Sequence, residues 1–394
     1  MKKLLTLTVA ACLGLSLSAQ DKKEAEGYKF TDIKRLPTTS VKSQDRTSTC
    51  WCWSTLSFFE TEIIRAGKDS VSLSPMFVVW NTYNGKGEKY VRMHGDMPFP
   101  AGGAAYDVQW AIKNYGIVPM SAYQGLNYGE NTHVHGELQA ILNSYADAVV
   151  KNANRKITPV WQKGYEGVLN AYLGEKPEKF TYKGKEYTPM SFAKEVGLNM
   201  DDYIQISSFS HHPFYEQFAI EVPDNWLWGT AYNLPLDVMM DVLDKAIDKG
   251  YSFAWGADIS EKGFGGEFAV VPTADTKEMS GSDMAKWLKL SAKDQEAALY
   301  KFDKPGKEKV ITQEMRQEEF DNYKTTDDHG MHIMGKAKDQ AGNPYFIVKN
   351  SWGPRGKYQG YFYASYPFVA FKTTSIMINK NALSKELRDK LGIK

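Results

Sequence analysis

An amphipathic pattern that begins at Cys50 is the feature that most restricts how this chain can fold. Trp53, Leu56 and Ile63 recur at three- and four-residue steps, and Gly67 follows as a stop signal. The pattern predicts a helix from Cys50 to Ala66 with one buried stripe. A cysteine therefore stands in the first turn of a helix, where backbone N–H groups have no partner within the helix.

Similar patterns place most of the other helices before most of the strands. Helices are expected over Leu73 to Tyr83, Tyr106 to Asn114, Leu138 to Asn152, Tyr165 to Leu173, Leu236 to Lys249 and Ser384 to Leu391. Strands are expected over Tyr251 to Ala257, Gly330 to Lys336, Tyr345 to Lys349 and Thr374 to Asn379. Residues 20–43 look irregular, and residues from about 125 to 205 look like a helical insertion. Helices followed by strands indicate an α+β fold.

Composition excludes some classes of partner. Hydrophobic residues make up 42% of the chain and charged residues 24%, which supports a sizeable core. The 48 basic and 47 acidic side chains nearly cancel, and no basic block is interleaved with aromatic residues. Nucleic acid is therefore not an expected partner.

The N-terminus has the pattern of an export signal. Lys2 and Lys3 precede an uncharged apolar run from Leu4 to Ala19, and a charged segment follows. We expect residues 1–19 to be a signal peptide and residues 20–394 to be a periplasmic or extracellular domain. The apolar run is too short for a membrane span, and no other segment qualifies. Lipid anchoring at Cys12 is the alternative, because Val9 to Cys12 resembles a lipobox.

The cysteines suggest reactivity rather than a disulfide. The sequence contains only Cys12, Cys50 and Cys52, and Cys12 falls within the expected signal. One intervening residue would strain a disulfide between Cys50 and Cys52. A thiolate at Cys50 would be favoured by the positive end of the helix, whereas Cys52 is expected to be a small buried residue.

Three separated blocks resemble the papain superfamily of cysteine peptidases. In the first block, Gln44 lies six residues before Cys50-Trp51. In the second, His329 lies at the start of a predicted strand, six residues before Gly335. The third block is Asn350-Ser351-Trp352-Gly353. The resemblance implies a two-lobed fold, with a helical lobe and an antiparallel β lobe, and peptide or protein substrates. Cys50 would be the nucleophile, His329 its base and Asn350 the residue that orients the histidine.

The same resemblance implies further site residues. Gln44 would donate to the oxyanion, and Trp352 would shield the histidine–asparagine hydrogen bond. Gly102 and Gly103 would face an extended substrate with their backbone. Asp328 would either tune the charge of His329 or remain exposed.

Other segments resemble the bleomycin hydrolase or aminopeptidase C branch. They are Leu73-Ser74-Pro75-Met76, Gly102-Gly103 with Tyr115 to Pro119, parts of the insertion, and Asn233 to Val238. The branch implies an aminopeptidase-like exopeptidase and a homo-oligomer, commonly a hexamer. However, the C-terminal arm motif that restricts cleavage in that branch is not found, and the export signal is unusual for it. Endopeptidase or dipeptide-releasing activity is therefore the alternative, and the hexamer is in doubt.

The remaining cysteine, histidine and tryptophan residues allow other interpretations. Cys50, Cys52, His329 and His332 do not have a usual zinc spacing, so no metal or cofactor is expected, and His332 reads as a packed strand residue. His211 and His212 read as surface histidines or as neighbours of the cleft. The remaining histidines, His94, His133 and His135, read as structural or solvated, and Trp226, Trp228 and Trp255 as core. An acyltransferase and a catalytically silent peptide-binding protein also remain open.

Overall fold

The computed structural model describes residues 27–99, 101–153 and 156–394. The predicted signal peptide, residues 1–19 with Cys12, lies outside these residues. Across the described ranges, every helix is too short or too polar to span a bilayer.

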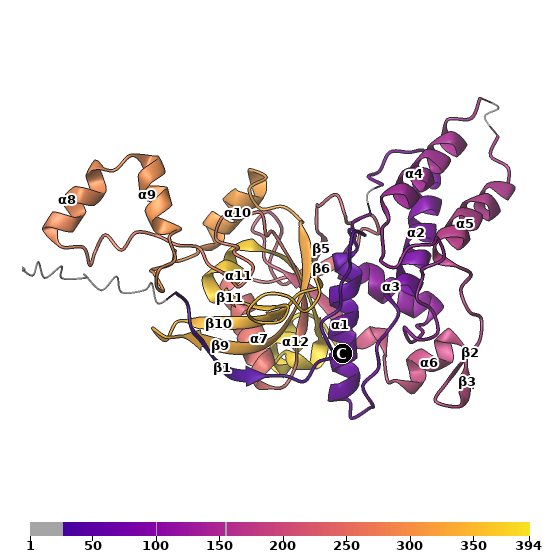
Figure 1. The fold of residues 1–394 in the computed structure, drawn as a ribbon, viewed down its shortest axis with the longest axis horizontal. Coiled ribbons are helices and arrows are strands. Elements are labelled where there is room, and N and C mark those ends of the chain that lie inside the picture. The colour runs from indigo at the N-terminus through magenta and orange to yellow at the C-terminus, as the bar shows by residue number, and fades with distance from the viewer. Residues whose placement is uncertain (1–26, 100, 154–155) are drawn as a thin grey trace, which may run out of the picture.

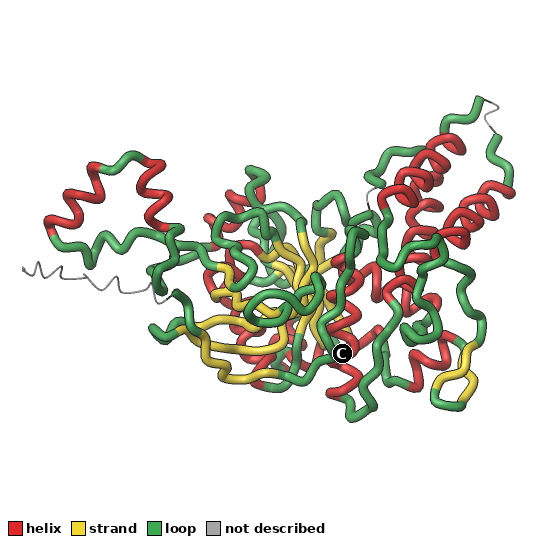
Figure 2. The backbone as a smooth tube through the Cα atoms, in the orientation of Figure 1, coloured by secondary structure: helices red, strands yellow, loops and turns green. Residues whose placement is uncertain are grey.

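One lobe is built from helices (Figures 1 and 2). Its helices are α1 (Cys50–Arg65), α2 (Pro75–Arg92), α3 (Ala105–Tyr115), α4 (Gly136–Val150), α5 (Val160–Leu173) and α6 (Pro189–Glu195). A small hairpin of β2 (Phe180–Tyr182) and β3 (Lys185–Tyr187) precedes α6, and the 3-10 helix η1 (Met200–Asp202) follows it. Buried side chains of α1 to α6 belong to one hydrophobic cluster, so α4, α5 and α6 share the core of α1, α2 and α3.

The helix α2 is longer than the sequence suggested. Its start agrees with prediction, because the Ser74 side chain accepts a hydrogen bond from the Phe77 backbone N–H and Pro75 lies in the first turn. The helix continues past Tyr83 to Arg92, through Gly85 and Gly87. A Cβ at Gly85 or Gly87 would lie 2.5 Å from Trp110 or Tyr165. Close packing of α3 and α5 therefore explains both glycines.

The other lobe is a ten-stranded mixed sheet in the order β5-β6-β4-β12-β7-β9-β10-β11-β8, with β1 also paired to β9. The strands are β1 (Phe30–Arg35), β4 (Tyr203–Ser207), β5 (Gln217–Ala219), β6 (Thr230–Asn233), β7 (Phe253–Ala257), β8 (Phe268–Ala269), β9 (His329–Asp339), β10 (Pro344–Lys349), β11 (Tyr361–Ser365) and β12 (Thr373–Asn379). The central strand β9 pairs antiparallel with β7 over His329 to Ile333 and with β10 over His332 to Lys338.

Further helices belong to this lobe or project from it. They are α7 (Leu236–Asp248), α8 (Gly281–Lys289), α9 (Ala292–Leu299), α10 (Gln313–Asp321), α11 (Tyr366–Lys372), the 3-10 helix η2 (Lys380–Ala382) and α12 (Lys385–Lys390). Figure 1 shows α8 and α9 standing away from the sheet, and neither has a buried residue. Leu387 and Ile393 pack against the same core as α7, which places the last residues against that helix.

Residues 20–43 are not irregular throughout, as the sequence had suggested. Phe30–Arg35 forms β1, which pairs antiparallel with the far half of β9, from Arg35 opposite Gly335 to Phe30 opposite Asp339. None of its side chains is fully buried, so the alternation that marks a half-buried strand is absent. The α+β, two-lobed architecture itself is confirmed.

Candidate active site

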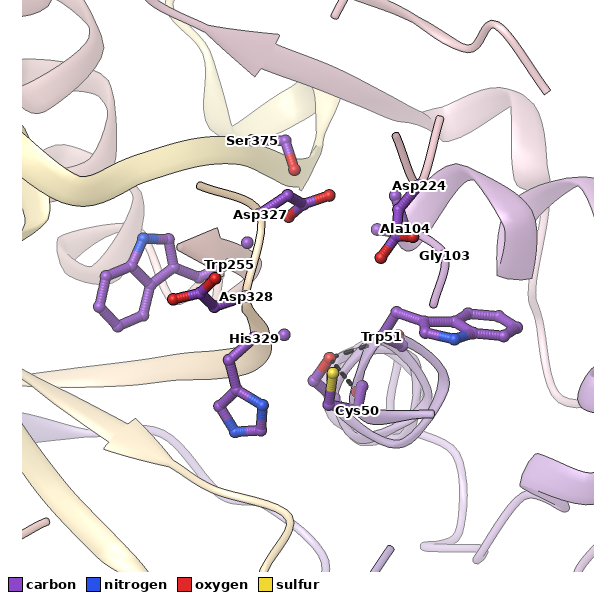
Figure 3. Close-up of a pocket in the computed structure, with 14 residues that line it drawn as sticks. Cys50, Trp51, Gly103, Ala104, Asp224, Trp255, Asp327, Asp328, His329 and Ser375 are labelled. Carbon is purple, nitrogen blue, oxygen red and sulfur yellow. Dashed lines mark hydrogen bonds between the residues drawn. The ribbon is translucent and has the colours of Figure 1, made fainter. Parts of the chain in front are cut away.

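The first residue of α1 meets the first residue of β9 where the two lobes join. Figure 3 shows the Cys50 side chain and the His329 ring facing each other across a pocket. Gly330 allows this approach, because a Cβ there would lie 2.8 Å from Ser54 Oγ and 2.9 Å from the Trp51 Cα. A glycine after the histidine thus lets the strand pack directly on the helix.

The His329 ring is held by two neighbours from the segment after β10. Its Nε2 lies 2.8 Å from Asn350 Oδ1, so the imidazole N–H donates to the amide oxygen. The Trp352 ring stacks on the imidazole, with ring centroids 4.8 Å apart and planes at 29°. The Asn350 Oδ1 also accepts from the Ser351 backbone N–H at 2.8 Å, which fixes the amide orientation. The ring therefore keeps its other nitrogen free to face Cys50.

Burial sets the resting charge of the two facing groups. Cys50 keeps partial exposure, yet burial raises the pKa of its thiol to about 11, with smaller contributions in the same direction from Asp327 and Asp224. The backbone N–H groups of Gly330 and Trp51 act in the opposite direction and lower that pKa, as expected at a helix start. Burial also lowers the pKa of His329, against the effect of its hydrogen bond to Asn350. Burial therefore disfavours the charged form of each group in the absence of substrate.

Asp328 precedes the histidine and is exposed. Its carboxylate accepts hydrogen bonds from Thr326 Oγ1 at 2.7 Å and from the Ser260 backbone N–H at 3.2 Å. The negative charge of Asp328 raises the pKa of His329, although less than burial lowers it. The side chain is exposed, as one of the two alternatives expected, and a role for Asp328 in the site stays a prediction.

Gln44 is buried beside the pocket rather than in its wall. Ser351 Oγ donates to Gln44 Oε1 at 2.7 Å, and the Gln44 backbone N–H donates to the Ser351 carbonyl at 2.8 Å. These two contacts hold Gln44 against the Asn350-Ser351-Trp352 segment. The oxygen of the amide is thereby occupied, while its NH₂ group stays available as a donor.

Gly102 and Gly103 lie against acidic side chains. A Cβ on Gly102 would be 1.9 Å from Asp224 Oδ2, and one on Gly103 would be 2.4 Å from Asp107 Oδ2 and 3.0 Å from the Trp51 ring. Neither position can carry a side chain without moving a carboxylate. Gly103 lines the pocket; Gly102 does not.

The sequence predicted only part of the wall of this pocket. Cys50, Gly103, Asp328 and His329 line it, while Gln44, Gly102, Asn350 and Trp352 lie behind or beside it. Sequence reasoning missed Asp224, Asp327, Trp255, Gly256 and Ser375, which also line it. The Asp327-Asp328 pair directly before His329 was the one local signal available; Asp224 has none.

The other candidate residues are accounted for by packing. Cys52 is wholly buried, with Sγ 3.4 Å from the Pro75 carbonyl oxygen, and His332 is buried with Nδ1 2.9 Å from Ser57 Oγ. His94 is exposed, whereas His133 and His135 are buried. Trp226 and Trp255 belong to the interior, but Trp228 is 61% exposed, so its prediction as a core residue was wrong. Trp228 instead stacks under Lys89, 4.0 Å from the ring centroid.

His211, His212 and Glu221 form the one group in the described ranges that brings three metal-ligand atoms within 4.8 Å. Gln317 Nε2 donates to His211 Nδ1 at 2.8 Å, which leaves the proton on Nε2, 3.0 Å from Glu221 Oε2. His212 Nε2 lies 2.6 Å from the other carboxylate oxygen. Both rings therefore serve as donors to Glu221, which explains the cluster without a metal.

The comparisons with known proteins agree with this geometry. Residues 300–379, which include His329 and Asn350, match the family model described as papain family cysteine protease. Aminopeptidase C of Streptococcus thermophilus is 22% identical, over 95% of this chain and 87% of that protein. Aminopeptidase G of Lactobacillus delbrueckii subsp. lactis is 21% identical, over 91% of this chain and 84% of that protein.

A solved structure shares the fold. The crystal structure of PepW from Lactobacillus rhamnosis superposes with a TM-score of 0.67 at 22% identity, over 92% of this chain and 84% of that chain. Residues 300–379 match the papain family of cysteine proteases, and over most of its length the chain is similar to proteins named aminopeptidase C.

Proposed function

We propose that the chain hydrolyses peptide bonds through Cys50, His329 and Asn350. The observation that supports this most is the orientation of the His329 ring: one nitrogen is engaged by Asn350 at 2.8 Å and the other side of the ring faces Cys50 (Figure 3). A histidine held in one tautomer beside a thiol is the arrangement that nucleophilic catalysis by cysteine needs.

The steps follow from the positions of the groups. The Cys50 thiol passes its proton to His329 as the sulfur attacks the scissile carbonyl carbon. The negative oxygen of the tetrahedral intermediate accepts from the Cys50 backbone N–H and the Gln44 amide. The imidazolium then protonates the amine as the C–N bond breaks, leaving a thioester on Cys50. Water, deprotonated by His329, attacks the thioester and releases the acid and the free thiol.

Replacing each cysteine in turn tests the nucleophile. Cys50→Ala should lower kcat for peptide hydrolysis by about a thousandfold or more, because the thioester cannot form. Cys52→Ala is the matched control, since its sulfur is buried against Pro75 two residues away. The control should keep activity within a few-fold and lose some thermal stability. If Cys50→Ala retains full activity, the proposal is wrong.

We propose an exopeptidase that removes N-terminal residues, in line with the relatives named aminopeptidase C and G. A more open mode, endopeptidase or dipeptide-releasing, is the second candidate. It is favoured by the position of residues 380–394, which pack on the α7 side rather than line the described pocket. Matched peptides with free and acetylated N-termini separate the modes by product analysis. Complete refusal of acetylated peptides would exclude the endopeptidase.

The same peptides distinguish hydrolysis from the other classes considered. A silent peptide-binding protein would release no product from any of them. An acyltransferase would release the amine but give an acid product only when no competing amine is present. Mass spectrometry of both product halves, with and without added glycinamide, reports which of these occurs.

We propose that residues 1–19 direct export, on the basis of the Lys2-Lys3 start and the apolar run to Ala19. Fractionation of cells that express the full chain, followed by N-terminal sequencing, tests this. A mature chain that starts at Gln20 outside the cytoplasm supports it, and lipid on Cys12 would indicate the anchored form. A homo-oligomer is proposed only from the family resemblance, and light scattering of the purified protein would measure it.

A further inference from the structure

Two carboxylates face each other in the pocket that contains Cys50 and His329. Asp224 lies in the connection between β5 and β6, and Asp327 in the segment that leads into β9 (Figure 3). The two residues are over a hundred positions apart in the chain, yet both line the same pocket. Asp224 fits at this place only because residue 102 is a glycine. A Cβ on Gly102 would overlap the Oδ2 atom of Asp224.

The protein supplies few partners for these carboxylates. Among the described residues, no ion pair within 4 Å reaches Asp224 or Asp327, and the closest donor to Asp327 is Thr374 Oγ1 at 3.3 Å. Burial raises the pKa of both groups, and the charge of Asp224 raises that of Asp327 further, to about 7. Each carboxylate would therefore gain from a cation placed between them.

The surroundings are negative overall. The one lysine that acts on Asp224 is Lys86, whose Nζ donates to the Gly102 carbonyl at 2.6 Å. Asp107, wholly buried behind Gly103, shares the effect of the same lysine. Asp328, next to Asp327 in the chain, also lines the pocket. Lys86 acts on Asp224 and Asp107, whereas the charges that act on Asp327 are those of Asp224, Asp328 and Asp107.

The negative charge of these carboxylates disfavours ionisation of the Cys50 thiol. Asp327 and Asp224 both raise the pKa of Cys50, so they oppose thiolate formation while the pocket is empty. A cation that pairs with them would remove that opposition at the moment the substrate is bound. A peptide carries such a cation at its N-terminus, and some peptides carry another on a lysine or arginine side chain.

We propose that Asp224 and Asp327 form a subsite of the catalytic pocket that binds an ammonium or guanidinium group of the peptide substrate and so selects substrates that carry it beside the scissile bond. This rests on the proposed peptidase function of Cys50. The α-ammonium of the N-terminal residue and a basic side chain are the two sources of this cation. Binding the former would give exopeptidase behaviour without any help from the C-terminal residues.

The test measures kcat/KM for four peptides. Each peptide is assayed with the wild-type enzyme, with the Asp224→Asn variant and with the Asp327→Asn variant. The peptides have a free or acetylated N-terminus, each with alanine or lysine next to the scissile bond. Wild type should prefer the substrate that carries the cation, and each Asn variant should lose that preference by about 10- to 100-fold in kcat/KM. Loss of the free-over-acetylated preference assigns the α-ammonium, and loss of the lysine-over-alanine preference assigns the side chain. Asp241→Asn, on the exposed face of α7, is the control and should retain both preferences.

A second measurement does not depend on hydrolysis. The rate of Cys50 alkylation by iodoacetamide is followed from pH 5 to about 7.5, the range in which alaninamide is a cation, with alaninamide or with its neutral analogue N-acetylalaninamide. Alaninamide should shift the alkylation profile of the wild type to lower pH, and this shift should vanish in the two Asn variants. The Asn substitutions alone should also move the profile to lower pH, because a negative neighbour is removed.

The outcomes separate the two proposals. If Cys50→Ala abolishes hydrolysis but the Asn variants keep all wild-type preferences, the subsite is wrong and the peptidase stands. Equal slowing of all four peptides in folded variants would likewise overturn the subsite. If no peptide is hydrolysed by the wild type, the peptidase proposal fails, while the alaninamide shift still decides whether the carboxylates bind a cation.

Discussion

At the scale of single residues, the account depends on how firmly His329 is held. The hydrogen bond to Asn350 and the stacked Trp352 ring restrict the imidazole from two directions. Asn350→Ala should leave KM nearly unchanged and lower kcat by about 100-fold, because a small displacement of a catalytic group costs about that much. Trp352→Phe keeps a stacked ring and should cost far less. A kcat unaffected by Asn350→Ala would show that the ring needs no such support.

The half-buried carboxylate of Asp327 gives a prediction about stability. Its pKa is raised to about 7 by burial and by the charge of Asp224, whereas an aspartate in an unfolded chain titrates near about 4. The folded state therefore binds a proton more tightly, and stability is lost as pH rises from about 4 to about 7. Asp327→Asn removes this loss.

Thermal unfolding at two pH values checks the sign of that effect. Asp327→Asn should raise Tm more at pH 8, where the wild-type carboxylate is ionised, than at pH 5, where it is largely protonated. An equal rise at both pH values, or no rise at pH 8, would contradict the linkage. A variant that is more stable but less selective is expected where a residue serves binding rather than folding.

Residue-level prediction from sequence worked where the signal was local. Cys50, His329 and Asn350 each lie in a short block whose internal spacing can be read from the sequence, and the structure brings these three blocks together. Asp224 and Asp327 could not be paired in this way, because their proximity depends on how the β5–β6 connection folds over Gly102. No periodicity encodes such a contact.

At the scale of elements, the site depends on how closely β9 approaches α1. Gly330→Ala would place a Cβ 2.8 Å from Ser54 Oγ and 2.9 Å from the Trp51 Cα, which forces the strand and His329 away from the helix. We expect a loss of about 1–3 kcal/mol in the free energy of unfolding and at least a tenfold fall in kcat/KM.

A second glycine supplies the control for that substitution. Gly167 lies within α5 with open space where its Cβ would be. Gly167→Ala should stabilise the protein by roughly 0.5–1 kcal/mol, as expected for a helix interior, and leave kcat/KM unchanged. If both alanine variants behave alike, the close approach of β9 to α1 does not control the site.

Helices and strands could be predicted where their apolar residues recur at regular steps in the sequence. The start of α1, the cap of α2 and strands β9, β10 and β12 were close to expectation. The far half of α2 was not, since glycines such as Gly85 and Gly87 disfavour a helix interior, and only the packing of Trp110 and Tyr165 against them explains their presence. Strand β1 was missed because its pairing with β9 involves backbone groups and leaves its side chains largely exposed.

At the scale of the whole molecule, a buried charge on α1 ties distant segments together. Glu60 is fully buried; it accepts from Lys42 Nζ at 2.6 Å and from the Leu73 backbone N–H at 2.8 Å, and it also contacts Thr39 Oγ1. Thr39 in turn accepts from Lys349 Nζ of β10 at 2.8 Å. The network therefore connects the N-terminal segment, both lobes and the strand that precedes Asn350.

Removing Glu60 should weaken the fold as a whole. Glu60→Ala leaves a buried lysine without its partner and should cost about 3–5 kcal/mol in the free energy of unfolding, measured by urea denaturation. Glu88→Ala removes a largely exposed pair with Arg92 and should cost less than about 1 kcal/mol. Equal effects of the two substitutions would show that the network does not hold the lobes together.

The overall architecture was predictable from the order of helices and strands and from the family resemblance, while the course of the cleft was not. Its walls come from α1, the Gly102-Gly103 turn, the β5–β6 connection and β12, and only the packing of the two lobes determines which of their side chains meet.

Selective alkylation tests the peptidase account most directly. Limited iodoacetamide is added while peptide hydrolysis is followed, and the modified protein is mapped by mass spectrometry. We predict one carboxamidomethyl group, on Cys50, with Cys52 unmodified and activity lost in proportion to the modified fraction. Full activity in protein that is completely alkylated at Cys50 would contradict the account.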